Sequence, residues 1–115
     1  MNRGDIYNVD LGPIPNDRKE QAGVRPAIAV SLGSLDKNNP LVSVIPLTTN
    51  LSSKDKPFTL LISPSQYNNL KQPSLALVSH VGPLDKRQIL NFIGHLERPY
   101  MEKINQLLKD LFRLQ

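Results

Sequence analysis

Tyr7-Asn8-Val9-Asp10-Leu11 alternates apolar and polar side chains, which is the period-2 pattern of a strand with one buried face. The next two apolar runs are Pro26 to Ser31 and Leu41 to Leu47, with Val42 and Val44 on one face of the second run. The connections between the runs are too short for repeated crossover helices, so the strands are expected to pair antiparallel.

Three further segments extend this pattern toward the C-terminus. Phe58 to Ile62 and Ser74 to Val81 are short apolar runs bounded by turn residues, and Ile93 to Leu96 is a candidate sixth strand. Asp85 to Leu90 is predicted to form a short helical turn. Many short strands without crossover helices indicate a small twisted antiparallel barrel.

The end of the chain changes to a helical period. Ile104, Leu107, Leu108 and Leu111 recur at i, i+3, i+4 and i+7, and Pro99 lies where the first turn of a helix tolerates proline. We expect a C-terminal helix whose apolar stripe packs on the barrel. The predicted fold class is therefore mostly β with a C-terminal helix.

Length and composition limit the possible architectures and chemistries. With 115 residues, 39% of them hydrophobic, residues 1–115 are expected to form a single domain around one core. The absence of cysteine excludes disulfides, thiolate zinc sites and a cysteine nucleophile. No apolar run approaches the roughly 18 residues of a membrane span, and no secretory signal pattern opens the chain, so the expected location is the cytoplasm. A net charge of +4 favours polyanionic partners.

The segment Glu20-Gln21-Ala22-Gly23-Val24-Arg25-Pro26 closes an irregular stretch, Gly12 to Val24, that is predicted to be a loop. It places one arginine between a flexible glycine and a proline, immediately before an apolar strand. The guanidinium is a planar fork of donors that stays charged, which suits phosphate binding. The alternative for Arg25 is a loop arginine that pairs with an acid.

Four pieces occur in a fixed order along the chain: RGDIYNVDL at Arg3 to Leu11, the EQAGVRP loop, a strand ending IPLTTN at Asn50, and Lys56-Pro57-Phe58. Together they resemble the MazF/PemK family of toxin endoribonucleases, and the likeness covers nearly the whole chain. The resemblance implies an SH3-like small antiparallel barrel of the CcdB/PemK type.

The same resemblance implies a metal-independent, sequence-specific endoribonuclease that acts as the toxin of a toxin–antitoxin pair. Its expected substrate is single-stranded RNA, of the messenger class, cleaved by 2′-hydroxyl attack to leave a 2′,3′-cyclic phosphate and a 5′-hydroxyl. It also implies a homodimer that binds RNA across the subunit interface, and a cognate antitoxin that occupies that groove. No cofactor is expected.

By the same resemblance, Arg25 and Thr48 form the catalytic pair and Glu20 is a third catalytic position. Arg25 would stabilise the charge of the phosphorane, Thr48 would hold the phosphate, and Glu20 would orient the guanidinium or take part in proton transfer. The alternative role for Thr48 is strand-end capping or a cross-strand contact. The alternative for Glu20 is local charge balance beside Arg18, Lys19 and Arg25.

Six residues near these positions are candidates for RNA contacts, with solvated surface side chains as the alternative for the lysines: Lys19, Gln21, Thr49, Lys54, Lys56 and His80. His80 stands where the family commonly carries Gln. Ser79 and Gly82 replace its usual acidic and basic residues. We expect retained activity with altered specificity. The alternative is that these replacements weaken cleavage. His95 is expected to be a structural histidine.

The sequence offers little for other kinds of site. It has no clustered acids, no histidine pair at metal-ligand spacing and no Gly-rich phosphate loop. Two rival functions stay open: a family member that binds RNA or antitoxin without cleaving, and a gyrase poison of the CcdB type. Against the second, that family ends in Trp-Gly-Ile, whereas this chain has no Trp and ends Arg113-Leu114-Gln115.

Overall fold

The structure is a computed structural model that describes residues 1–12, 23–31 and 39–114. Most of the loop predicted from Gly12 to Val24, and most of the connection predicted from Leu32 to Pro40, lies outside these residues. The chain forms the following elements in order: β1 (Asp5–Asp10), β2 (Val24–Ala29), β3 (Leu41–Thr48), β4 (Thr59–Ile62), β5 (Ser74–Leu77), β6 (Gly82–Asp85), β7 (Ile89–His95) and α1 (Arg98–Leu111). Short 3-10 helices occupy Leu51–Ser53, Val78–His80 and Lys86–Gln88.

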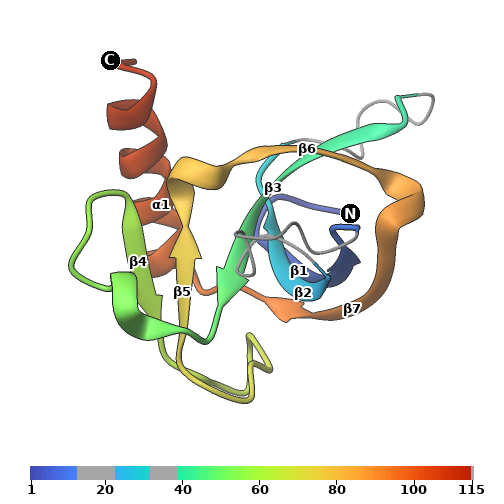
Figure 1. The fold of residues 1–115 in the computed structure, drawn as a ribbon, viewed down its shortest axis with the longest axis horizontal. Helices are drawn as coiled ribbons and strands as arrows, with labels where there is room; N and C mark the ends of the chain where they lie inside the picture. Colours follow the sequence, from blue (N-terminus) through green and yellow to red (C-terminus); the bar gives the residue numbers. More distant parts are fainter. Residues whose placement is uncertain (13–22, 32–38, 115) are drawn as a thin grey trace.

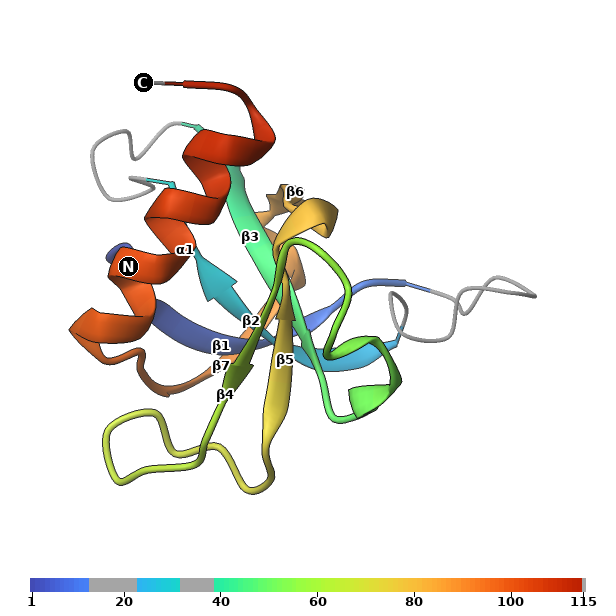
Figure 2. The same cartoon turned by 90° about the vertical axis from the view of Figure 1, so that its left-hand side faces the viewer.

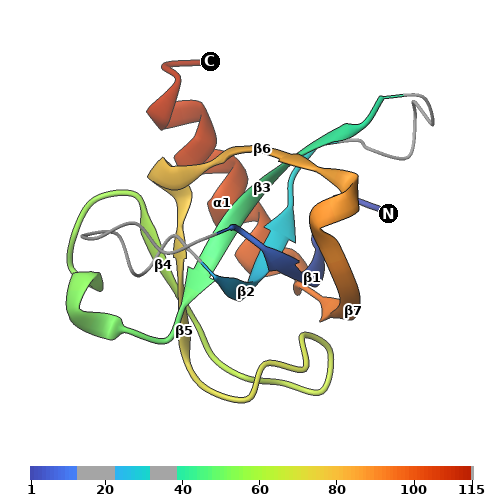
Figure 3. The ribbon, with the colours of Figure 1, turned by 45° about the vertical axis from the view of Figure 1, so that its right-hand side comes forward.

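All strand pairs are antiparallel, in the order β4-β5-β3-β2-β1-β7, and β6 pairs with β3 outside this path. β3 runs through the middle of the molecule (Figure 3). β6 runs from the side of α1 across β3, and β7 follows it around the opposite end (Figure 1). Among the described strands, no ladder joins β4 to β7, so the strongly curved sheet is an open barrel.

The two faces of the central strands belong to different parts of the core. Ile28 and Ile45 lie opposite each other and pack in one cluster with Ile6, Ile62 and the helix residue Ile104, all at 0% exposure. Their neighbours along the strands point the other way, because side chains alternate between the faces of a sheet. Ala27, Ala29 and Val44 are such neighbours, and they form a second cluster with Val9, Val42 and Leu84. The central strands are thus buried on both faces.

Helix α1 lies on one side of the sheet, against β4 and the turn at Val78–His80 (Figure 2). Ile104 is fully buried, and Leu107 and Leu108 are partly buried against the same cluster, which confirms the predicted stripe. Pro99 lies in the first turn, where no intrahelical N–H bond is lost. No helix among the described residues is both long and apolar enough to cross a membrane.

The structure confirms a mostly β fold with a C-terminal helix, and it corrects the number of strands. The described residues form seven strands in place of five or six, because the run predicted from Ser74 to Val81 breaks after Leu77. The chain makes a 3-10 turn there, with the Val81 N–H donating to the Val78 carbonyl at 3.1 Å, and then leaves β5 to pair with β3 as β6. The predicted sixth strand begins earlier, at Ile89.

Candidate functional site

Strand β3 takes part in separate ladders along its length. Residues 41–44 pair with β6, Val44 to Pro46 pair with β2, and Leu47 and Thr48 pair with β5. β2 in turn pairs with β3 only at Ala27 to Ala29, whereas its earlier residues pair with β1 alone. The first half of β2 and the end of β3 therefore separate, and a pocket opens between them.

Pro26 explains why the ladder between β2 and β3 stops at this point. The Val30 N–H donates to the Ser43 carbonyl of β3, while the Ala29 carbonyl accepts from Gly4 on the other side. Since backbone groups alternate sides along a strand, those of Ile28 and Pro26 also face β3. Proline has no N–H to donate, so the next ladder bond from β2 to β3 is missing.

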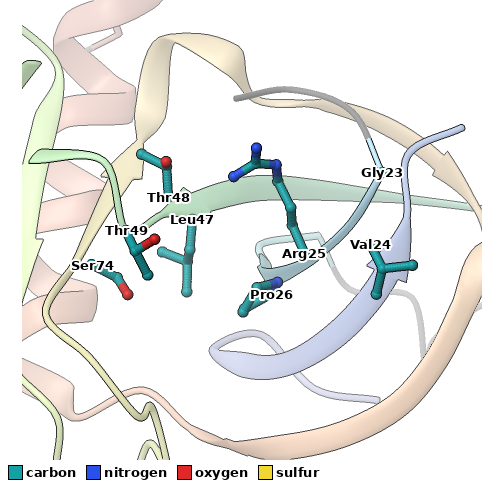
Figure 4. Close-up of a pocket in the computed structure, with 8 residues that line it drawn as sticks. All are labelled: Gly23, Val24, Arg25, Pro26, Leu47, Thr48, Thr49 and Ser74. Carbon is teal, nitrogen blue, oxygen red and sulfur yellow. The ribbon is translucent and has the colours of Figure 1, made fainter. Parts of the chain in front are cut away.

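The pocket that opens there has a volume of about 410 Å³. It is lined by Gly23, Val24, Arg25, Pro26, Leu47, Thr48, Thr49 and Ser74. Figure 4 shows the Arg25 side chain extending toward Thr48 while Val24 points away. Among the described residues that line this pocket, Arg25 carries the one ionisable side chain, so the pocket is suited to an anion. We call it the Arg25–Thr48 pocket.

Arg25 and Thr48 are held in different ways. Arg25 lies opposite Val9 in the β1–β2 ladder, two residues after Gly23, whose φ of +77° is in the left-handed region that favours glycine. Thr48 is 4% exposed, and its Oγ1 accepts the N–H of Asn50 at 3.1 Å. The predicted capping role of Thr48 is therefore real, and its hydroxyl hydrogen is still available as a donor.

A second pocket, of about 300 Å³, lies on the other side of Thr48. Its lining includes Lys56, Ser79 and His80, three residues that the sequence analysis singled out. Thr48 lines both pockets, so the two adjoin. Together they bring a guanidinium, a hydroxyl, an ammonium and an imidazole to one region, which is a suitable arrangement for an anionic chain longer than one phosphate.

Not every predicted site residue falls in these two pockets. Lys19, Glu20 and Gln21 lie outside the described residues, so their roles stay predictions. They belong to the segment that leaves β1 at Gly12 and returns at Gly23, where the Gly23 N–H donates to the Gly12 carbonyl at 3.0 Å. Lys54 is exposed and lines neither pocket.

His95, the last residue of β7, is held by the buried carboxylate of Asp5 in β1. Its Nδ1 lies 2.8 Å from Oδ1 of Asp5, which is 6% exposed. The Tyr7 hydroxyl donates to Oδ2 of the same Asp5 at 3.4 Å. Burial, together with the charge of Asp5, raises the pKa of Tyr7. His95 thus makes a structural contact with Asp5 and, unlike His80, does not line the second pocket, as expected.

Sequence reasoning missed Ser74, the first residue of β5, which completes the wall of the Arg25–Thr48 pocket beside Thr49. The pairing of Leu47 and Thr48 with β5 brings it there. No local motif marks this serine, so the strand pairing was the one signal that could have located it. Within the described ranges, no three His, Cys, Asp or Glu side chains are grouped as metal ligands.

Comparison with known proteins finds relatives over nearly the whole chain. The chain is 29% identical over 108 residues to the endoribonuclease MazF of Staphylococcus saprophyticus, covering 94% of this chain and 88% of the relative. MazF from Deinococcus radiodurans superposes with a TM-score of 0.79 at 21% identity, covering 99% and 97% of the two chains. A mycobacterial endoribonuclease, solved in complex with its cognate antitoxin, superposes with a TM-score of 0.76 at 23% identity, covering 100% and 97%.

The family comparison covers almost the whole sequence. A family model described as "PemK-like, MazF-like toxin of type II toxin-antitoxin system" matches residues 2–112. This span includes every strand, the helix and both pockets. The chain therefore belongs to the PemK-like, MazF-like family of toxins of type II toxin–antitoxin systems.

Proposed function

We propose that this protein is an endoribonuclease toxin that cleaves single-stranded RNA, of the messenger class, without a metal ion. One observation carries the proposal: Arg25 and Thr48 reach the same pocket from different ladders, in a chain of this family. The proposal includes a cognate antitoxin, a homodimeric state and action in the cytoplasm.

The reaction needs little covalent chemistry from the protein. The 2′-oxygen of the RNA loses its proton and bonds to the adjacent phosphorus, while the bond from phosphorus to the 5′-oxygen breaks. The leaving oxygen takes up a proton, and the products are a 2′,3′-cyclic phosphate and a 5′-hydroxyl. The protein must align the 2′-hydroxyl with the phosphate and stabilise the charge that builds on the phosphate oxygens.

Arg25 and Thr48 are suited to this stabilisation. A guanidinium donates in parallel to two phosphate oxygens and keeps its charge at any working pH. Thr48 donates its hydroxyl hydrogen to a phosphate oxygen, while its oxygen is fixed by the N–H of Asn50. Both side chains line one pocket, which supports a mechanism that needs little reorganisation in the transition state. Glu20 is the proposed proton acceptor, on the grounds of its sequence position.

The second pocket extends the RNA site beyond the scissile phosphate. Lys56 is proposed to contact a neighbouring phosphate, and His80 a base or sugar on the far side of Thr48. Because His80 and Ser79 replace the family's usual residues at this wall, the proposed change is in base preference and not in the cleavage step.

The decisive experiment compares wild type with Arg25→Ala on a long natural RNA in excess chelator, with new ends mapped by primer extension. Arg98→Ala is the matched control, because Arg98 is exposed at the start of α1 and lines neither pocket. Discrete cuts are expected from wild type and Arg98→Ala. A fall of about 10²- to 10³-fold or more in rate is expected for Arg25→Ala, the range seen when a transition-state donor is removed.

Two outcomes would contradict the proposal. Cuts that persist in Arg25→Ala would show that this arginine is not part of the site. A wild-type protein that leaves several long RNAs intact would favour a family member that binds RNA or antitoxin without cleaving.

A further inference from the structure

A third cavity adjoins the Arg25–Thr48 pocket and is not used by the proposed cleavage step. It has a volume of about 450 Å³ and shares Pro26, Thr49 and Ser74 with that pocket. Its remaining wall comes from β1, β7 and the loop between β4 and β5. We call it the amide pocket, because four of its lining residues carry carboxamides: Asn8, Asn69, Gln72 and Asn91.

Strand register places part of this wall on one face. Asn8 of β1 lies opposite Pro26 of β2 and, on its other side, opposite Asn91 of β7. Side chains at opposed positions point to the same side of a sheet. The Asn8 Nδ2 donates to the Asn91 Oδ1 at 3.3 Å, which leaves the Asn8 Oδ1 without a donor among the described residues.

The loop between β4 and β5 is fixed against this face by a buried asparagine. Asn68 is 0% exposed. Its Oδ1 accepts the N–H groups of Ser65 and Leu70, each at 3.0 Å, and its Nδ2 donates to the Ser63 carbonyl and to Glu97. A buried amide whose donor and acceptor are both used rigidifies its surroundings. The loop that presents Asn69 and Gln72 is thus preorganised.

Gly94 allows the same loop to approach β7 closely. A Cβ at Gly94 would lie 2.6 Å from the carbonyl oxygens of both Tyr67 and Asn68, and such contacts do not occur in real structures. The approach lets the Asn69 Nδ2 donate to the Ile93 carbonyl at 2.9 Å. The Asn69 Oδ1 and the side-chain amide of Gln72 have no hydrogen-bond partner in the part of the chain that the structure describes. Acceptors and donors therefore remain for a ligand.

The apolar part of the lining comes from Leu70 and Ile93. Phe92 also lines the pocket, but it lies opposite Tyr7 in the β1–β7 ladder, so its ring points to the other face of the sheet. There it makes edge contacts with Tyr7, at 5.5 Å between centroids, and with His95, at 5.0 Å. Lys71, on the pocket's edge, adds a positive charge for the attached backbone.

We propose that the amide pocket binds one unpaired nucleobase of the RNA, next to the nucleotide whose phosphate lies at Arg25, and sets the base preference there. This proposal rests on the proposed function. Carboxamides present a donor and an acceptor side by side, which matches the hydrogen-bonding edge of a base, and Leu70 and Ile93 add apolar surface beside them. A peptide of acidic side chains would find one cation and a row of neutral amides here.

The test maps the cleavage sites of wild type, Asn91→Ala and Gln72→Ala on the same long RNAs and compiles the base found at each position around the cuts. Gln106→Ala is the matched control, because it removes an exposed amide from α1 that lines none of these three pockets. We expect base discrimination at one flanking position to fall about tenfold in Asn91→Ala. Gln72→Ala is expected to raise KM with a smaller effect on kcat, because it removes an amide that would contact the base. Gln106→Ala is expected to cut as wild type.

Circular dichroism shows whether each variant folds, and two variants from different walls keep the test valid if one does not. Unchanged site preference and KM in both folded variants would overturn the inference while leaving the nuclease proposal intact. Loss of antitoxin binding with unchanged RNA cleavage would also overturn it, in favour of a peptide site. If wild type cuts no RNA, binding of 2′-O-methyl RNA decides: equal affinity of wild type and both variants overturns the inference, and weaker binding by the variants supports it.

Discussion

The single hydroxyl of Thr48 takes part in one observed hydrogen bond and in one proposed hydrogen bond. Its oxygen accepts the Asn50 N–H, and its hydrogen is directed to the phosphate in the proposed reaction. At 4% exposure the side chain has little freedom to choose another rotamer. The same packing that caps the strand end would therefore also position the proposed donor.

Thr48→Val and Thr48→Ser separate these roles. Valine keeps the shape but removes the hydroxyl, so we expect kcat/KM on a fluorogenic RNA to fall about 10²-fold, as for the loss of one transition-state donor. Serine keeps the hydroxyl, so most of the activity is expected to remain. A Thr48→Val protein that folds and retains wild-type kcat/KM would remove Thr48 from the proposed mechanism.

The residues of the site differ in how far sequence alone could predict them. Arg25 lies in a local Gly-Val-Arg-Pro pattern whose chemistry can be recognised without a fold, and Thr48 follows an apolar strand in a known arrangement. Ser74 and Asn91 have no such local pattern, because they join the pockets through strand pairing alone. A residue whose role depends on its partner across a ladder cannot be read from its own neighbours in the chain.

At the scale of elements, β6 shows the same limit. Gly82 to Asp85 contains a proline and only one buried apolar side chain, Leu84, so its pattern favours a turn. It forms a strand because its backbone pairs with residues 41–44 of β3. The helix and the longer strands were predictable because their periods of 3.6 and 2 repeat over enough residues.

The corner between β6 and β7 leads to a pH prediction. Asp85 accepts hydrogen bonds from the backbone and side chain of Arg87, and these bonds lower the pKa of Asp85 below its ordinary value of 3.8. A pKa that is lower in the folded state favours folding at pH above the unfolded value, and the gain is lost as pH falls through the folded value. Asp85→Asn should therefore be less stable than wild type at neutral pH, with a difference that shrinks below about pH 4.

Urea unfolding of both proteins between pH 2.5 and pH 7 measures this difference. Asp55→Asn is the control, since Asp55 is exposed and makes no hydrogen bond among the described residues. A gap between wild type and Asp85→Asn that stays constant over the range would contradict the assignment of the stabilising bonds to the charged carboxylate.

For the whole molecule, the proposed homodimer is the next question. Several large apolar side chains are more than half exposed in the single chain, including Val24 at 62% and Leu90 at 53%. Apolar surface of this kind suits a protein partner. We expect sedimentation velocity to give a dimer over the micromolar range; a monomer at every concentration would contradict the dimer and the binding of RNA across a subunit interface.

Pro26 gives the site a further property. The gap between β2 and β3 is maintained by a covalent ring that lacks a hydrogen, so neither acid nor salt can change the reason it is open. The attraction of Arg25 for phosphate, in contrast, is screened by ions. The shape of the pocket and its hold on RNA therefore respond to different conditions: raising the ionic strength should release the substrate while the cleft that received it stays ready for the next strand.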